Sequence, residues 1–147
     1  MKKDSVSLFC LFLILILSAC DFNAPLRNKM LDFYNQNSNY VQLTGVVMKM
    51  ECLEELDQLR IGVKILTENH SFSSVVENEY VDFVIVNWSV NSFELKINDT
   101  IDFTSAPFYF YNGHIYPIVE IKKDGQEYLS FHEGKDNYLK WINDTFD

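Results

Sequence analysis

Apolar and polar residues alternate along most of the chain from residue 40 onward, which is typical of half-buried β-strands. In the first such run, residues 40–51, the side chains of Val41, Leu43 and Val47 share one face. Gly45 lies at the centre of this run and allows the bend of a strand that curls. The same pattern predicts further strands at residues 59–65, 82–90, 93–97, 101–103, 108–111, 115–122 and 127–131.

The strongest turn signal is the pair Asn112-Gly113, because both residues accept the positive φ values of a type I′ turn. It predicts a hairpin between residues 108–111 and 115–122. Apolar residues also recur at helical spacing on either side of the strand-rich part of the chain. We therefore expect a short helix around residues 26–34 and a second helix over residues 135–143, with Asp136 as its N-cap.

Several short strands with turns between them and few helices predict a mainly β fold, a small antiparallel β-barrel or a sandwich. The strand order over residues 41–122 resembles an OB-fold, in which a polar turn leads into the fourth strand of a five-stranded barrel. Asn98-Asp99-Thr100-Ile101 stands at that position, although the usual glycine before Asp99 is missing. The resemblance implies an OB-like barrel with short N-terminal and C-terminal helices. Another small barrel, a sandwich and an α+β fold remain alternatives.

Residues 1–20 (MKKDSVSLFCLFLILILSAC) combine a basic start, an apolar run and small residues before Cys20. A membrane-spanning helix needs about 20 apolar residues, and this run is shorter, so it predicts a cleaved export signal. The last four residues, LSAC, resemble the lipobox of bacterial lipoproteins. The resemblance implies cleavage before Cys20 and a diacylglycerol with palmitate-type chains on its thiol. An ordinary secretory signal that is cut nearby is the alternative.

We therefore expect the chain to divide into a signal peptide (1–19), a tether (20–39) and one barrel domain (40–147), and to be exported and anchored to a bacterial membrane by lipid on Cys20. The formal charge is −9, and removal of residues 1–19 takes away two lysines and one aspartate, which makes it −10. Phosphate backbones are bound through Lys and Arg, so this balance disfavours nucleic acid as a partner.

Of the three cysteines, Cys10 lies in the signal and Cys20 is consumed by the lipid, which leaves Cys52 in the folded part. No internal disulfide is then possible. Because Cys52 lies between Met50 and Leu53, we expect it to be a small buried apolar residue.

Aromatic residues between positions 88 and 116 form the first candidate site. OB-folds bind oligonucleotides or oligosaccharides with stacking aromatic rings. Strand alternation turns about half of these rings inward whatever the function, so packing in the core and the hairpin is the favoured interpretation. The possible contacts to a ligand or partner are Trp88, Tyr109, Tyr111, His114 and Tyr116.

The titratable residues give no catalytic or metal-binding signature. His70, His114 and His132 lack the spacing of a metal site, so no metal and no cofactor is expected. The carboxylates at residues 51–57 fit a solvated acidic face, and no nucleophile motif such as Gly-x-Ser-x-Gly is found. We therefore expect no enzymatic activity.

The expected function is a lipid-anchored envelope protein that acts as a non-enzymatic binding or assembly module. It would contact the membrane through its lipid anchor and a protein or glycan in the envelope. An acidic inhibitor or immunity lipoprotein is a variant of this class, because the charge suits a basic partner. The second class is an envelope hydrolase with an unrecognised site, which requires a polar cleft that contains carboxylates or histidines with shifted pKa values.

Overall fold

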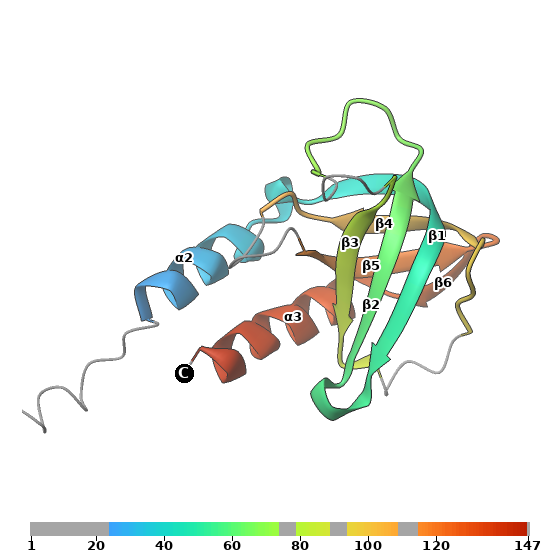
Figure 1. The fold of residues 1–147 in the computed structure, drawn as a ribbon. Coiled ribbons are helices and arrows are strands. Elements are labelled where there is room, and N and C mark those ends of the chain that lie inside the picture. Colours follow the sequence, from blue (N-terminus) through green and yellow to red (C-terminus); the bar gives the residue numbers. More distant parts are fainter. Residues whose placement is uncertain (1–23, 74–78, 89–93, 109–114, 147) are drawn as a thin grey trace, which may run out of the picture.

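Strands in which buried and exposed residues alternate close into a barrel in the computed structural model (Figure 1). The structure describes residues 24–73, 79–88, 94–108 and 115–146. Two helices lie beside this barrel. The elements are α2 (Ala24–Asn35), η1 (Asn37–Asn39), β1 (Val41–Leu53), η2 (Glu54–Leu56), β2 (Gln58–Ile65), β3 (Val81–Val86), β4 (Thr100–Ser105), β5 (Ile115–Lys123), β6 (Gln126–Leu129) and α3 (Phe131–Thr145).

The barrel has the strand order β1-β2-β3-β5-β4, and β6 pairs with β5 outside it. All neighbours are antiparallel except β3 and β5, whose parallel pairing from Asp82 with Ile115 to Val84 with Pro117 closes the ring. This topology confirms the predicted mainly β, OB-like barrel. Within the residues that the structure describes, no helix is long and apolar enough to cross a membrane.

Strand β1 pairs with β4 through its first half and with β2 through its second half, and its register with β2 shifts at a bulge between Val47 and Lys49. A Cβ atom on Gly45 would lie 2.4 Å from Val63 Cγ1, so the two strands approach too closely for any side chain. At the bulge, the Val47 N–H donates to the Asp99 carbonyl (2.9 Å), and the Asn98 N–H donates to the Val47 carbonyl (2.8 Å). The polar turn before β4 is thus fixed to the centre of β1.

The barrel interior is filled by the inward-facing residues of every strand, as the alternation predicts. The rings of Phe83 and Phe103 meet edge to face at 5.1 Å between centroids, and Phe72 packs against Tyr116 at 4.8 Å. The largest fully buried side chains of this core are Leu59, Ile61, Phe83, Ile85, Ile101, Phe103, Tyr116, Ile121 and Leu129.

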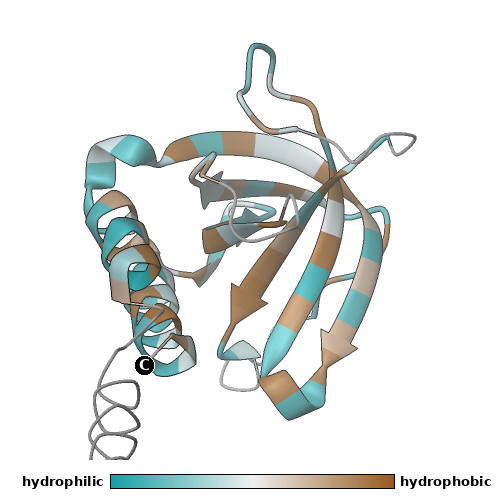
Figure 2. Cartoon of the chain, turned by 60° about the vertical axis from the view of Figure 1, so that its left-hand side comes forward, coloured by the Kyte–Doolittle hydropathy of each residue, from teal (hydrophilic) through white to brown (hydrophobic). Residues whose placement is uncertain are grey.

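A second core lies between the two helices and the outer face of β3 and β5. Figure 2 shows both helices on the same side of the barrel. Met30 and Tyr34 of α2 are fully buried there, and Tyr34 packs edge to face on Tyr138 of α3 at 4.9 Å. The segment 20–39, expected as a tether, therefore carries from Ala24 onward a helix that belongs to the folded unit.

The helices are antiparallel and cap each other with basic side chains. Arg27 of α2 donates to the Phe146 carbonyl at the end of α3 (3.0 Å), and Lys135 of α3 donates to the Asn35 carbonyl at the end of α2 (2.7 Å). A cation at the carboxyl end of a helix meets unpaired carbonyls and the negative end of the helix dipole. Each helix therefore stabilises the other.

Helix α3 starts earlier than predicted, at Phe131, and its N-cap is Ser130 rather than Asp136. The Ser130 hydroxyl accepts from the Glu133 N–H at 3.4 Å. Ser130 and Glu133 form the Ser-x-x-Glu spacing of a capping box, a signal that the apolar spacing alone did not give. The predicted strand at 93–97 is also wrong for residues 94–97, which form a loop, and the Asn112-Gly113 turn lies outside the described residues.

Candidate functional site

A cleft of about 220 Å³ lies between the β1–β2 turn and the C-terminal half of α3. We call it the barrel-end cleft. The end of β3 forms its third wall, so three segments that are distant in the sequence meet in it. Its lining residues are Leu56, Asp57, Val86, Asn87, Asn137, Lys140, Trp141 and Asp144.

Two residues in the left-handed region of φ shape the loops around the barrel-end cleft. Asp57 (φ 49°) turns the chain from η2 into β2, and Asn87 (φ 56°) turns it away from β3. Asp and Asn tolerate this conformation better than other residues with a Cβ. The Trp88 N–H donates to the Asp57 carbonyl at 3.3 Å, which ties the two loops together.

The wall between β3 and α3 contains an amide pair with one unmatched donor. Asn87 Nδ2 donates to Asn137 Oδ1 at 3.2 Å. Asn137 Nδ2 is buried, and no acceptor for it lies among the residues that the structure describes. Leaving a buried donor unpaired costs about 1–3 kcal/mol, so this arrangement is not optimised for stability alone.

The apolar part of the barrel-end cleft consists mainly of Trp141 and Leu56. Trp141 is partly exposed, and one of its faces stacks on Tyr138 with 5.5 Å between centroids and 17° between planes. Its orientation is therefore fixed. Leu56 is 57% exposed at the tip of the β1–β2 turn, although a leucine gains from burial.

Carboxylates outnumber cations at the barrel-end cleft. Asp57 and Asp144 line it together with Lys140, and the exposed Glu54 and Glu55 lie beside it on the same turn as Leu56. Asp144 is in the last turn of α3, which contains no basic residue. A carboxylate is disfavoured there by the helix dipole, so its position does not serve the stability of the helix.

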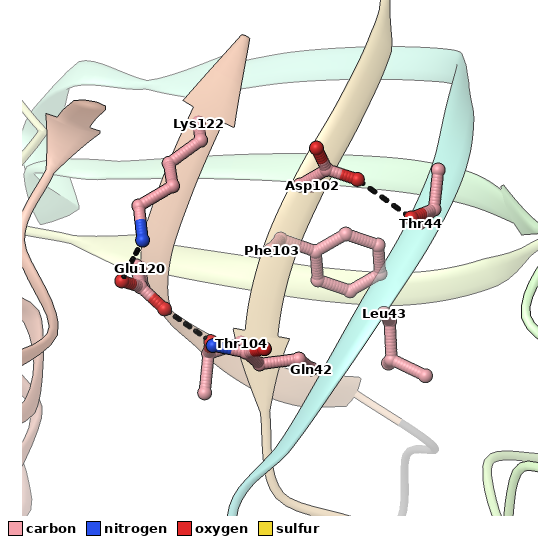
Figure 3. A pocket seen from close by; sticks show the side chains of 8 residues that line it. All are labelled: Gln42, Leu43, Thr44, Asp102, Phe103, Thr104, Glu120 and Lys122. Carbon is pink, nitrogen blue, oxygen red and sulfur yellow. Dashed lines mark hydrogen bonds and ion pairs between the residues drawn. The ribbon is translucent and has the colours of Figure 1, made fainter. Parts of the chain in front are cut away.

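A second depression, which we call the polar groove, crosses the outer face of β1, β4 and β5 and has a volume of about 260 Å³ (Figure 3). Thr104 Oγ1 donates to Glu120 Oε2 at 2.5 Å, and Lys122 Nζ lies 2.8 Å from Glu120 Oε1. Thr44 Oγ1 donates to Asp102 Oδ1 at 2.6 Å. Both oxygens of Glu120 therefore have partners.

The pKa of Glu120 follows from this network. Burial raises the pKa, but the hydrogen bonds from Lys122 and Thr104 and the charge of Lys122 outweigh burial, so the pKa is lower than usual. The same contacts with Glu120 raise the pKa of Lys122. Glu120 is thus held ionised at neutral pH, which suits a structural ion pair rather than a general acid.

A similar ion pair fixes the turn before β4. Lys123 Nζ lies 2.9 Å from Asp99 Oδ2, and the Lys96 N–H donates to the same oxygen at 2.7 Å. The hydrogen bond from Lys123 lowers the pKa of the Asp99 carboxyl and raises that of the lysine. The polar turn that the sequence places before the fourth strand therefore has a structural task.

The residues proposed as ligand contacts do not form one exposed surface. The prediction that Tyr116 contacts a ligand was wrong, because its side chain is 1% exposed inside the barrel. Its Oη accepts a hydrogen bond from the Ser73 N–H at 3.2 Å. Trp88 is partly buried and packs against the same core. Tyr109, Tyr111 and His114 lie outside the described residues. Core packing, the favoured alternative, is confirmed for Tyr116.

The expectation for Cys52 was also wrong, because its side chain is exposed. It lies near the end of β1, next to the β1–β2 turn. Among the described residues, His70 lies beside Phe72 and His132 lies 3.4 Å from Asp136 on α3. In the same part of the chain, no group of three or more His, Cys, Asp or Glu side chains could hold a metal ion.

Comparisons of the chain with protein-family models, with curated proteins and with solved structures find no match.

The sequence analysis did not identify the α3 residues of the barrel-end cleft. Asn137, Trp141 and Asp144 recur at intervals of four and three residues, so they share one face of a helix. An exposed face with one tryptophan among polar residues is the signal that could have identified them.

Proposed function

We propose that the protein is an exported, lipid-anchored binding module that holds its ligand in the barrel-end cleft and performs no catalysis. One observation carries the proposal: the cleft combines a fixed tryptophan, an exposed leucine and a buried amide donor that has no acceptor among the described residues. Ligand sites typically pair apolar and aromatic walls with a few polar groups that orient the ligand. OB-folds also bind ligands through the β1–β2 loop, which supplies Leu56 and Asp57 here.

Binding is favoured over hydrolysis by the state of the charged groups. Glu120 and Asp99 have shifted pKa values, and in both cases the shift is downward and comes from a lysine in direct contact. General acid–base catalysis needs a group whose pKa lies near the working pH. These carboxylates are instead held in the charged form by partners that occupy their oxygens.

Anchoring rests on the lipobox-like residues 17–20 and is tested by Cys20→Ser. We expect the natural protein to fractionate with membranes and to show the mass of diacylglycerol on a chain that begins at Cys20. The variant cannot form the thioether, so it should leave the membrane fraction or keep its signal peptide. A natural protein without lipid mass, or a variant that fractionates unchanged with its signal removed, contradicts the anchor.

The location of the ligand site is tested by photo-crosslinking in the cells that produce the protein. A benzoylphenylalanine is placed at Leu56 in the barrel-end cleft or, as a matched control, at Leu66. Both leucines are more than half exposed, at 57% and 53%, and they flank opposite ends of β2.

We expect a discrete crosslinked product from position 56 that is absent from position 66. Equal products from both positions would indicate non-specific contact. No product from position 56 would contradict the assignment of the cleft as the ligand site.

A further inference from the structure

We infer that the barrel-end cleft receives a lysine or arginine side chain from a basic segment of a partner protein. The inference rests on the proposed function, which it makes specific. It commits to a cationic protein segment, and a neutral glycan is the competing outcome.

Charge supports a cationic occupant. Asp57 and Asp144 lie on opposite walls of the cleft, with Glu54 and Glu55 exposed beside it. Among the described residues of the lining, Lys140 is the one cation, so they carry a net negative charge. The chain as a whole carries −9, which also draws basic partners from a distance.

Asp144 places a negative charge at the cleft in a position where the helix itself would favour a basic residue. At the carboxyl end of each of the two helices, a basic side chain of the other helix donates to a terminal carbonyl: Arg27 at the end of α3 and Lys135 at the end of α2. Asp144 is the opposite choice in the last turn of α3. A residue that opposes local stability at the edge of a cleft is expected where function selects it.

Trp141 provides the surface for the aliphatic stem and the cationic head. Since Tyr138 stacks on one of its faces, the indole is held in place before a ligand arrives. Lysine and arginine groups are attracted to the face of an indole, and tryptophan is the strongest of the aromatic residues in this respect.

Asn137 provides a contact that suits a polypeptide. Its Nδ2 is buried without an acceptor, and Asn137 itself lines the cleft. A rotation of its amide presents this donor to the backbone carbonyl of a bound segment. Such a contact satisfies a group that is unpaired within the described residues.

The test follows the side-chain N–H signals of Asn137 and Trp141 by NMR in the mature protein, as the cell processes it. The first probe is a capped decapeptide of alternating glycine and arginine. The second replaces arginine by glutamate, and the third is the neutral tetramer of N-acetylglucosamine. We expect only the arginine peptide to shift these signals, with an affinity that falls as salt rises from about 50 to about 300 mM.

Two substitutions must act in opposite directions. Asp144→Asn should weaken the arginine peptide about threefold, and Lys140→Gln should strengthen it about threefold, because each changes one charge of the lining. Asp124→Asn, in the exposed β5–β6 turn, is the matched control and should leave the affinity unchanged. A merely structural role of these residues would not produce a gain of affinity.

The outcomes separate this inference from the proposed function. Shifts from the saccharide alone overturn the cationic partner but leave the cleft as a binding site. Binding of arginine peptide that is equal in Asp144→Asn, Lys140→Gln and Asp124→Asn means general attraction to an acidic protein and also overturns the inference. The crosslinking at Leu56 uses none of these probes, so it tests whether the cleft is a binding site separately from the chemistry of what binds there.

Discussion

The barrel-end cleft and the polar groove are similar in volume, about 220 and 260 Å³, but differ in how their polar atoms are satisfied. In the groove, Glu120 has partners on both oxygens, and its neighbours are strands of one barrel. In the cleft, Asn137 has a donor that no described residue pairs with, and Asp144 opposes the helix dipole. The size of a depression is therefore a weaker guide to function than interactions left incomplete inside it.

The largest expected effect on stability comes from Gly134→Ala, which should disturb the barrel-end cleft more than the polar groove. A Cβ atom at this position would lie 2.1 Å from the Val119 carbonyl oxygen, so α3 would have to move away from β5. We expect a loss of about 3 kcal/mol in the free energy of unfolding, measured with urea. Because α3 forms a wall of the cleft but not of the groove, the NMR signals of Trp141 should change more than those of Thr104.

The matched control for Gly134→Ala is Asn143→Ala, on the exposed face of the same helix. It should be neutral or stabilising by about 0.5 kcal/mol, since alanine favours helix. If Gly134→Ala is as stable as the natural protein, α3 is not held tightly against β5.

The next effect is Glu120→Gln in the polar groove. It removes the charge that pairs with Lys122, and we expect a loss of about 1–2 kcal/mol at neutral pH. Binding at the cleft should not change. If folded Glu120→Gln loses affinity for the arginine peptide, the polar groove is not independent of binding at the cleft.

The same variant makes a pH prediction. Glu120 has a folded-state pKa below its ordinary value of 4.5, so its stabilisation is fully present above that value and is lost as pH falls through the folded pKa. The difference in stability between the natural protein and Glu120→Gln should therefore shrink below about pH 4.5. A difference that stays constant down to pH 3 would show that the charge of Glu120 does not stabilise the fold.

The smallest effect on stability is expected from Asp144→Asn in the barrel-end cleft. Removal of a carboxylate from the last turn of α3 should leave the free energy of unfolding unchanged or raise it by up to about 0.5 kcal/mol. Affinity should fall in the same protein, as proposed above. Loss of stability would mean that Asp144 serves the fold, which would remove the contrast with Glu120.

The strands were predictable because burial of one face imposes a period of two on the sequence, and Gly45 marked the place where β1 lies close to β2. The parallel closure of β3 on β5 follows from the OB-like strand order rather than from either strand alone. Tyr116 shows the limit of this reasoning, since alternation says that half of the rings point inward but not which half.

The barrel-end cleft was not predictable in this way. It joins Asp57, Asn87 and the residues of α3, which meet only after the helix packs on the closed barrel. Their spacing in the sequence carries no sign of this contact. What the sequence did hold was local: the Ser130 and Glu133 capping signal for the start of α3, and the stripe of Asn137, Trp141 and Asp144 along it.

The early start of α2 has a consequence for geometry at the bilayer. Three residues separate Cys20 from Ala24, the first residue of a helix that is packed into the fold. Four steps along the backbone cover at most about 15 Å. If lipid is attached at Cys20, the first residue of α2 stays within that distance of the anchored residue, so the folded unit has little freedom to move away from the membrane surface.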